Sequence, residues 1–372
     1  MSWLSDIARP EIRALRAYEH AAWEPGLVRL HANESPWRTP TDTSLEGLNR
    51  YPEPHPEQLT AALADLYGVA APMLLAGRGS DEPIDLLLRC YCRAGQDAVV
   101  ICPPTFGMYA VAARIQGAIL HEVPLLAATG FGLDAAALRA IAAVGHGPRR
   151  AAPVKLVFLC SPNNPTGNRH DPDALLALAR ALEGHALLVV DEAYIEFAQG
   201  PSLVPQIADT PGLVVLRTLS KAHALAGARC GVAIAHPEVI ALLRRIIQPY
   251  ALTQLTIETV FAALRPEARA RAEQRIAALK SERARVSAAL RALPQVQRVW
   301  PSETNFLLVE FTDAGAALAR AHAAGLLLRD LRGGGARGGG ALGSGVLGEA
   351  LRISLGTREQ NDRLLASLGA GA

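Results

Sequence analysis

Residues 213–231 read Leu-Val-Val-Leu-Arg-Thr-Leu-Ser-Lys-Ala-His-Ala-Leu-Ala-Gly-Ala-Arg-Cys-Gly. The apolar run at 213–216 predicts a buried strand, and Lys221 follows it among small residues. A lysine that is desolvated in this way loses basicity and can form a Schiff base with an aldehyde. Two hydroxyls and a planar guanidinium in the same stretch suit a phosphate group: Thr218, Ser220 and Arg229. Taken alone, the stretch fits an ordinary lysine at the end of a strand equally well.

Apolar runs alternate with helical patterns from residue 97 to residue 235. The runs predict strands at 98–102, 118–123, 155–160, 186–190, 214–216 and 231–235, with helices at 135–143 and 173–182. Continuous apolar runs separated by helices are typical of a mostly parallel sheet covered on both faces, which makes the fold class α/β. Ligands bind such sheets beyond the carboxyl ends of the strands. Polar clusters follow four of the runs, at 103–107, 161–167, 191–194 and 218–221.

A second anion-binding feature is predicted upstream of these strands. Gly77 and Gly79 are expected to form a turn, and Ser80 or Asp81 is expected to cap a helix that has Pro83 in its first turn. Free backbone N–H groups at such a helix start attract anions. Because Asp81 would oppose a phosphate by its charge, a phosphate should meet the backbone and Ser80 first.

The ends of the chain predict an arm and a second domain. Residues 1–30 are expected to form an arm with a short amphipathic helix around Ile12, Leu15 and Tyr18. The charged pattern at 265–293 predicts a solvated helix that leads to strands at 305–310, 326–329 and 350–354, with a flexible glycine-rich loop at 333–345. We therefore expect an arm (1–30), a large domain (31–262) and a small domain (263–372) to which the N-terminal segment contributes.

Composition excludes several functional classes. The net charge is +2 and no Lys/Arg-rich arm is present, so a nucleic-acid partner is not expected. Cys90 and Cys92 lack the spacing of a zinc or redox pair, and the odd total of five cysteines favours buried thiols in a reducing cytoplasm. With no signal-peptide pattern and no apolar run of about 18 residues, no membrane partner is expected either.

Four polar groups stand at the predicted strand ends of one sheet: Asn164, Asp191, Tyr194 and Lys221. Together they fit an aldehyde cofactor that contains a pyridine ring, with Lys221 holding the aldehyde. Asp191 would keep the ring nitrogen protonated, so that the ring acts as an electron sink. Tyr194 and Asn164 would donate to the phenolic oxygen, and Phe106 could stack on the ring. Each residue alone also has an ordinary structural explanation, but chance placement of all four is improbable.

The motifs Ser161-Pro-Asn-Asn-Pro-Thr-Gly167, Asp191-Glu-Ala-Tyr194 and Ser220-Lys221, with Arg229 eight residues on, resemble the fold type I pyridoxal-phosphate aminotransferases. Further segments resemble the histidinol-phosphate aminotransferase family within that group: Asn33-Glu-Ser-Pro36, Tyr51-Pro-Glu-Pro54, Gly77-Arg-Gly-Ser-Asp-Glu82, Pro104-Thr-Phe-Gly-Met-Tyr109, residues 222–231 and Leu351-Arg-Ile-Ser-Leu-Gly-Thr357. The resemblance covers residues 10 to 360. It implies a mostly parallel seven-stranded sheet in the large domain and an α+β small domain.

The resemblance also implies roles for particular residues. Lys221 is expected to hold pyridoxal 5'-phosphate as an imine and to shuttle the substrate proton, with Asp191 and Tyr194 assisting. A second set is implied at the cofactor phosphate: Ser80, Asp81, Thr218, Ser220 and Arg229. The family is dimeric, and Tyr51 is expected to reach the cofactor phosphate of the neighbouring subunit.

For the substrate, the resemblance implies Arg352 at the anionic end, with help from Arg329, Tyr18 and Asn33. Two guanidinium groups and a phenol suit a phosphate monoester better than a single arginine would. Two features depart from the family pattern. His223 stands where a phenylalanine is common, which predicts a packing change, and the loop at 333–345 lengthens the segment between Arg329 and Arg352.

The expected reaction exchanges an amino group between L-histidinol phosphate and 2-oxoglutarate, with glutamate as the counterpart. A phosphothreonine-type decarboxylase and an aromatic amino-acid aminotransferase share nearly every motif and remain alternatives. A pyridoxal-phosphate-sensing transcription regulator is the alternative outside enzymes. Such regulators carry a basic DNA-binding domain ahead of this fold, whereas the arm here is expected to begin near residue 10.

Overall fold

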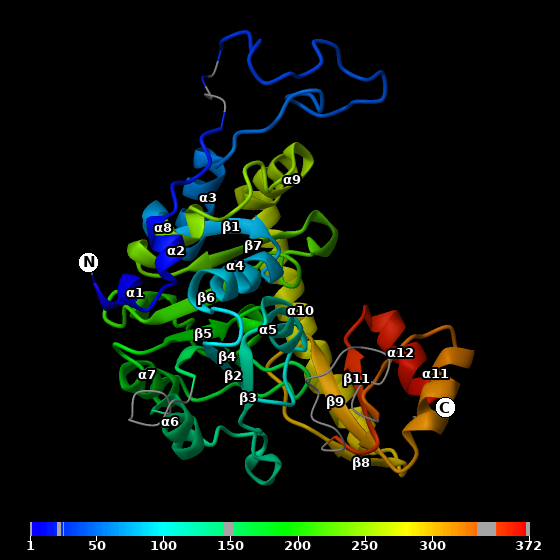
Figure 1. Cartoon of the computed structure of the whole chain (residues 1–372). Coiled ribbons are helices and arrows are strands. Elements are labelled where there is room, and N and C mark those ends of the chain that lie inside the picture. The colour runs from blue at the N-terminus through cyan, green and yellow to red at the C-terminus, as the bar shows by residue number, and fades with distance from the viewer. Residues whose placement is uncertain (1, 21–23, 25, 144–151, 333–346, 370–372) are drawn as a thin grey trace.

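The structure is a computed structural model that describes residues 2–20, 24, 26–143, 152–332 and 347–369. Its larger sheet has seven strands in the order β1-β7-β6-β5-β4-β2-β3 (Figure 1). These strands are β1 (Leu74–Arg78), β2 (Ala98–Ile101), β3 (Ile119–Glu122), β4 (Val154–Cys160), β5 (Leu187–Asp191), β6 (Leu213–Thr218) and β7 (Cys230–Ile234). The run from β3 to β6 is parallel, whereas β7 is antiparallel to both β6 and β1. The prediction of a mostly parallel α/β sheet is confirmed.

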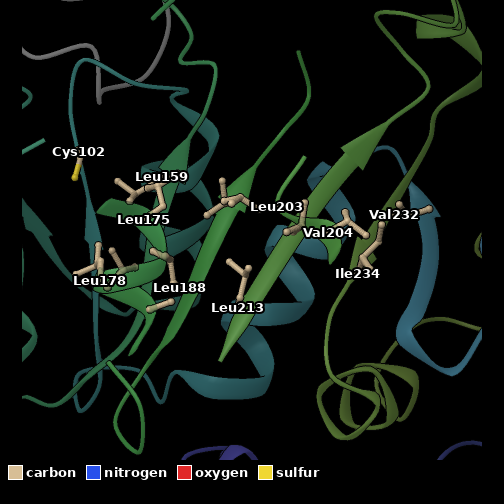
Figure 2. Packing of buried hydrophobic residues seen from close by; sticks show 14 of the residues in the cluster. Cys102, Leu159, Leu175, Leu178, Leu188, Leu203, Val204, Leu213, Val232 and Ile234 are labelled. Carbon is tan, nitrogen blue, oxygen red and sulfur yellow. The ribbon is translucent and has the colours of Figure 1, made fainter. Parts of the chain in front are cut away.

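Side chains alternate between the two faces of each strand, and this alternation divides the core in two. Val190 and Val215 belong to the hydrophobic cluster on one face, part of which Figure 2 shows, while Val189 and Leu216 belong to the cluster on the other. The helices of this domain are α3 (Glu57–Tyr67), α4 (Asp81–Tyr91), α5 (Met108–Gln116), α6 (Ala135–Ala143), α7 (Pro172–Ala181), α8 (Pro237–Arg244) and α9 (Gln254–Leu264). Short 3₁₀ helices lie at η1 (Ala71–Met73), η2 (Ala127–Thr129), η3 (Ile195–Phe197), η4 (Val204–Ile207) and η5 (Ala226–Ala228).

The edge strand β1 corrects one prediction. We expected Gly77 to lie in a turn, but it lies within β1 and faces Gly231 of β7 across the antiparallel ladder. Only Gly79, which has φ +71°, occupies the turn. A Cβ added at Gly231 would come within 2.5 Å of the backbone carbon of Gly79 and the nitrogen of Ser80. The glycines therefore allow β7 to lie directly against the β1–α4 turn.

The N-terminal arm also differs from expectation. It forms two short helices, α1 (Trp3–Asp6) and α2 (Pro10–Ala14), and the second ends before Leu15 and Tyr18, both of which are exposed. The arm packs on the large domain, because Leu4 is buried in its core and the side chains of Ser2 and Ser5 bond to Glu238 of α8. Figure 1 places α1 and α2 far from the second sheet, and the contribution of the N-terminal segment to the small domain stays a prediction.

The second sheet is antiparallel, with strand order β10-β11-β9-β8. Its strands are β8 (Val296–Val299), β9 (Phe306–Phe311), β10 (Arg329–Asp330) and β11 (Ala350–Ser354), and its helices are α11 (Ala314–Ala323) and α12 (Arg358–Ser367). The predicted bridging helix is α10 (Pro266–Arg291). The strand expected at 326–329 is reduced to the two residues of β10, and Leu327, which precedes it, is 88% exposed.

The expected domain boundary at residue 263 falls in the last turn of α9, and the division into domains stays a prediction. The glycine-rich segment 333–345 lies outside the described residues. Among the residues that are described, no helix is long and apolar enough to cross a membrane. The described part of the chain also contains no group of three or more His, Cys, Asp or Glu side chains placed to hold a metal ion.

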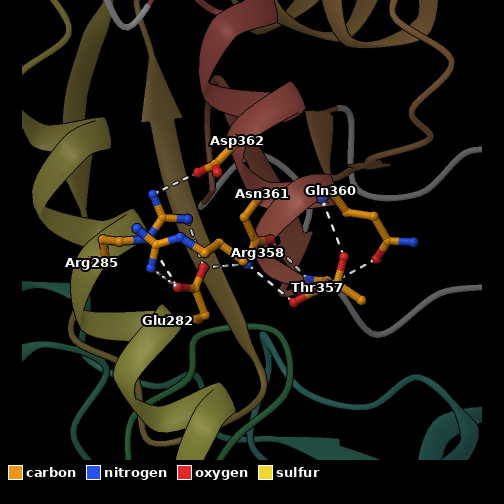
Figure 3. A network of polar contacts seen from close by, with 8 residues as sticks. Glu282, Arg285, Thr357, Arg358, Gln360, Asn361 and Asp362 are labelled. Atoms are coloured by element: carbon orange, nitrogen blue, oxygen red, sulfur yellow. Dashed lines mark hydrogen bonds and ion pairs between the residues drawn. The ribbon is translucent and has the colours of Figure 1, made fainter.

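A polar network joins α10, α12 and the turn after β11 (Figure 3). The Asn361 side chain is buried and donates to Glu282 of α10 at 2.9 Å and to the Gly356 carbonyl oxygen at 3.1 Å. It also accepts a hydrogen bond from the Gly356 backbone N–H at 2.9 Å. Asn361 therefore fixes the turn that follows Arg352, which belongs to β11.

Asn361→Ala should lower the free energy of unfolding by about 1–3 kcal/mol, because it leaves both backbone groups of Gly356 without their buried partner. Asp362→Ala, on the same helix, removes only a half-exposed ion pair with Arg285 and should cost less than about 1 kcal/mol. Urea unfolding of both variants measures the difference. Equal losses would contradict the assigned role of Asn361.

Candidate active site

A pocket lies beyond the carboxyl ends of β4, β5 and β6, where the α/β topology predicts ligand binding. Ten residues singled out from the sequence line it: Ser80, Asp81, Phe106, Asn164, Asp191, Tyr194, Thr218, Ser220, Lys221 and Arg229. A second pocket adjoins it, shares Phe106, Asn164, Tyr194 and Lys221, and adds Arg329 and Arg352 from the small sheet. The structure thus brings nearly all of the predicted site residues together.

Lys221 stands where these two pockets meet, just after β6. Its Nζ lies 5.9 Å from the centre of the Tyr194 ring. Lys221 remains exposed in the single chain, but the protein atoms around it lower its pKa, and the nearby guanidinium groups of Arg352 and Arg229 lower this pKa further. The lysine is therefore easier to deprotonate than a solvated one, as a nucleophilic amine requires.

Asp191 is the last residue of β5, and its carboxylate is buried. Burial raises the pKa of Asp191 to about 6, against the opposing effect of two hydrogen bonds. The Tyr109 hydroxyl donates to Oδ2 at 2.8 Å, and the Ala193 backbone N–H donates to Oδ1 at 3.0 Å. We did not single out Tyr109 from the sequence, because it reads there as an apolar position of α5. A buried carboxylate with so little compensation is typical of a functional site.

The turns after β1 and β6 form the end of the pocket that is suited to bind an anion. The Thr218 hydroxyl donates to Ser220 Oγ at 3.0 Å, and Arg229 Nη2 lies 3.1 Å from Asp81 Oδ2. Arg229 has φ +54°, a backbone conformation that is strained for a residue other than glycine and that clusters at functional sites. A Cβ at Gly79 would come within 2.6 Å of Arg229 Nη2, so the guanidinium can occupy this position because residue 79 has no side chain.

The second pocket ends at two arginines on neighbouring strands. Arg329 of β10 pairs in register with Arg352 of β11, and both line the pocket. Arg352 donates to the Asn164 side-chain oxygen, and its guanidinium carbon lies 5.4 Å from the centre of the Phe306 ring. Burial lowers the pKa of Arg352, and the charge of Arg329 adds to this effect. Phe306, which also contacts Tyr194 edge-on, has no distinguishing signal in the sequence beyond its place in an apolar run.

Three predicted residues lie away from both pockets: Tyr18, Asn33 and Tyr51. Tyr51 is 51% exposed and stacks on Tyr250 with 4.6 Å between ring centres. His223 is likewise absent from the lining of these two pockets and lies near Glu196 and Arg217. Burial lowers the pKa of His223.

A buried ion cluster supports the turn that carries Tyr194. Arg217, on β6, lies 2.8 Å from Glu196 and 3.6 Å from Glu192, and its guanidinium carbon lies 4.7 Å from the centre of the Tyr67 ring. Glu192 also accepts hydrogen bonds from Ser202 and from the Leu203 backbone N–H. The cluster ties the end of β6 to the segment that follows Asp191.

Arg217→Met should lower the free energy of unfolding by about 3–5 kcal/mol, because it leaves the buried Glu192 carboxylate and the partly buried Glu196 carboxylate without their cation. Burial already raises the pKa of Glu192, and removing Arg217 raises it further. A carboxyl group whose pKa is raised in the folded state destabilises the fold as the pH rises. Arg217→Met should therefore lose less unfolding free energy at pH 5 than at pH 8. Urea unfolding of the variant and the wild type at both pH values measures this difference.

The matched control is Arg89→Met, which removes a half-exposed pair with Asp85 within α4. This variant should lose less than about 1 kcal/mol at either pH. A loss for Arg217→Met that did not change with pH would argue against uncompensated carboxylates as its cause.

Comparison with known proteins gives one family. Residues 31–368 match the family model for aminotransferase class I and II. The histidinol-phosphate aminotransferase of Stenotrophomonas maltophilia (strain R551-3) is 48% identical over 366 residues, which are 98% of this chain and 96% of that protein.

Solved structures agree with the sequence relatives. The crystal structure of histidinol-phosphate aminotransferase from Sinorhizobium meliloti, in complex with pyridoxal-5'-phosphate, is 26% identical, with a TM-score of 0.72 over 86% of this chain and 82% of that one. The structure of a protein titled putative histidinol-phosphate aminotransferase from Erwinia carotovora atroseptica is 27% identical, with a TM-score of 0.72 over 86% and 87% of the two chains. The chain therefore belongs to the class I and II aminotransferases and, among them, to the histidinol-phosphate aminotransferase family.

Proposed function

We propose that this protein transfers the amino group of L-histidinol phosphate to 2-oxoglutarate, giving imidazole acetol phosphate and L-glutamate, as a reversible step of L-histidine biosynthesis. The observation that carries the proposal is the adjacency of two pockets. One holds a lysine, a buried carboxylate and a hydroxyl-rich anion site, and the other ends at Arg329 and Arg352. The two pockets meet at Lys221, as an amino-group exchange on that lysine requires.

The residues of the first pocket fit pyridoxal 5'-phosphate. The buried Asp191 carboxylate has hydrogen-bond donors but forms no ion pair with any residue that the structure describes, and a protonated ring nitrogen would supply a cationic partner. At the other end, Arg229, Ser80, Thr218 and Ser220 offer charge and hydroxyl groups for a phosphate. The bound cofactor supplies an electron sink that stabilises negative charge on the substrate carbon. We take it as the cofactor of this protein.

The side chains that line the first pocket would have separate roles in the reaction. Lys221 Nζ would hold the cofactor as an imine and, once free, would be the base that takes and returns the substrate proton. Asp191 would keep the ring nitrogen protonated, and Tyr194 and Asn164 would donate to the phenolic oxygen. Phe106, which lines both pockets, would stack on the ring and help to exclude water.

Arg352 and Arg329 would bind the anionic end of each substrate. Their guanidinium groups are fixed donors that suit both a phosphate monoester and the carboxylate of glutamate. One site can therefore serve both half-reactions. Tyr18 and Asn33, which lie away from the pocket within one chain, would contribute to substrate binding only after assembly.

The decisive experiment separates the two half-reactions. Adding L-histidinol phosphate to the holoenzyme should convert the aldehyde form of the cofactor to its amine form, and 2-oxoglutarate should restore it, as followed by absorbance. Lys221→Ala should lose both conversions and any borohydride-stable adduct at this position. Release of carbon dioxide would indicate the phosphothreonine-type decarboxylase, and conversion by phenylalanine or tyrosine but not by histidinol phosphate would indicate the aromatic aminotransferase. No conversion with any of these donors would overturn transamination and leave the regulator as the alternative.

We also propose that the protein is a homodimer in the cytoplasm. The reducing cytoplasm suits its five cysteines, all of which are free and buried. The described residues between Leu15 and Tyr51 extend away from the seven-stranded sheet (Figure 1), and many of their apolar side chains are exposed: Leu15, Tyr18, Leu27, Val28, Leu30, Trp37, Leu45, Leu48 and Tyr51. So many exposed apolar side chains in one segment favour an interaction surface, and a second copy is the occupant that would also bring Tyr51 to a neighbouring cofactor phosphate.

Leu30→Glu should therefore weaken the dimer, because Leu30 is 90% exposed in the single chain and would be covered in the pair. Leu327→Glu is the control, since Leu327 is 88% exposed on the small domain. Sedimentation equilibrium should give a dimer for the wild type and for Leu327→Glu, and a dissociation constant at least about tenfold higher for Leu30→Glu. A monomeric wild-type holoenzyme would contradict the proposal.

A further inference from the structure

Tyr109 is a buried polar residue to which the proposed reaction assigns no role. It lies in the first turn of α5, three residues after Phe106, and its side chain is inaccessible to solvent. Its ring stacks on Phe158 of β4, with 5.1 Å between ring centres, and meets Phe106 edge-on at 5.5 Å. Its hydroxyl donates to Asp191 Oδ2 at 2.8 Å and also lies beside the Cys160 thiol.

The two oxygens of Asp191 are held by different elements. The Tyr109 hydroxyl donates to Oδ2 from α5, and the Ala193 N–H donates to Oδ1 from the turn after β5. These two bonds fix the plane of the carboxylate. The Ala193 N–H belongs to the backbone and is present whatever the side chain. Only the hydrogen bond from Tyr109 therefore depends on the type of residue.

We propose that Tyr109 is a positioning residue for the cofactor: through its hydrogen bond it orients the Asp191 carboxylate and keeps it anionic, so that the shared proton stays on the cofactor ring nitrogen. This inference rests on the proposed function, because it concerns the same pocket. It adds a residue that does not line either pocket and that acts only through Asp191.

The sign of the effect follows from the charges around Asp191. Burial favours the neutral acid, and the charge of Asp81 acts in the same direction, whereas Tyr109, the Ala193 N–H and Lys221 favour the anion. If the hydroxyl of Tyr109 is removed, the proton affinity of the carboxylate increases. The shared proton then moves from the ring nitrogen toward Asp191, and the ring loses part of its power as an electron sink.

The groups that face Tyr109 do not offer a substitute donor. Cys160 lies beside both Tyr109 and Asp191, but its Sγ donates to the Pro162 carbonyl oxygen at 3.3 Å. Burial and the charge of Asp191 both raise the pKa of the Cys160 thiol, which keeps it neutral. Phe106 and Phe158 have no polar atoms in their side chains.

The test is Tyr109→Phe, which removes one oxygen and keeps the ring packing. Tyr91 supplies a matched control, since it is also inaccessible, lies in the same hydrophobic cluster, and has a hydroxyl with no hydrogen-bond partner among the described residues. Tyr91→Phe therefore removes an equivalent buried hydroxyl without touching Asp191. Both variants should fold, as judged by urea unfolding.

Three readouts separate positioning from packing. Apoprotein of Tyr109→Phe should bind pyridoxal 5'-phosphate about tenfold more weakly, as measured by quenching of intrinsic fluorescence. In the holoenzyme, kcat should fall about tenfold or more with little change in KM. The pH midpoint of the bound cofactor's absorbance change should rise, because a ring nitrogen that is less often protonated no longer disfavours a proton on the Lys221 nitrogen.

Tyr91→Phe should match the wild type in all three measurements. If Tyr109→Phe also matched the wild type in cofactor affinity and in the absorbance midpoint, the inference would be overturned, even if its kcat were low. Failure of the proposed function has a different signature, since wild-type protein would then not respond to histidinol phosphate and 2-oxoglutarate. If the wild type does respond, while Tyr109→Phe has unchanged cofactor affinity and an unchanged midpoint, the result counts against the role of Tyr109 alone.

Discussion

The burial of two carboxylates at the end of one strand is the constraint on which the rest of this structure depends. Asp191 and Glu192 are consecutive, so their side chains leave β5 toward opposite faces of the sheet. A buried carboxylate is costly unless it is paired or hydrogen-bonded. Glu192 is compensated permanently by Arg217, whereas Asp191 receives only neutral donors from Tyr109 and Ala193. The Glu192 carboxylate thus has its counterion within the chain, whereas the Asp191 carboxylate would gain one from a cationic ligand.

Close backbone packing and an ion pair also determine the anion-binding end of the pocket. Gly231 has no Cβ, so β7 can lie against the turn that contains Gly79 and Ser80. That contact brings the start of α4 next to the strained residue Arg229, whose guanidinium occupies the space left by Gly79. Asp81 holds the guanidinium from the other side at 3.1 Å. The position of the positive charge is therefore set by backbone packing more than by the arginine itself.

Much of this site could be predicted from the sequence, because polar clusters that follow parallel strands must meet at one edge of the sheet. That rule correctly placed Asn164, Asp191 and Lys221 in one pocket. It failed where the signal was weak or absent: β1 was not expected because Gly77 reads as a turn residue, and Tyr109 and Phe306 read as ordinary core positions. The periodic spacing of Leu15 and Tyr18 predicted a helix, but an apolar face forms a helix only where it has something to pack against, and both residues are exposed.

The contact between Arg352 and Asn164 connects the four-stranded sheet to the loop after β4 of the seven-stranded sheet. A guanidinium has donors only, so the side-chain oxygen of Asn164 must face Arg352. The amide nitrogen is then the end of Asn164 that remains to donate within the first pocket. The arginine of the four-stranded sheet thus sets which way the Asn164 amide points. An anion bound at Arg352, as proposed for the substrate, would compete with that amide oxygen, so this one hydrogen bond would link anion binding to the orientation of Asn164.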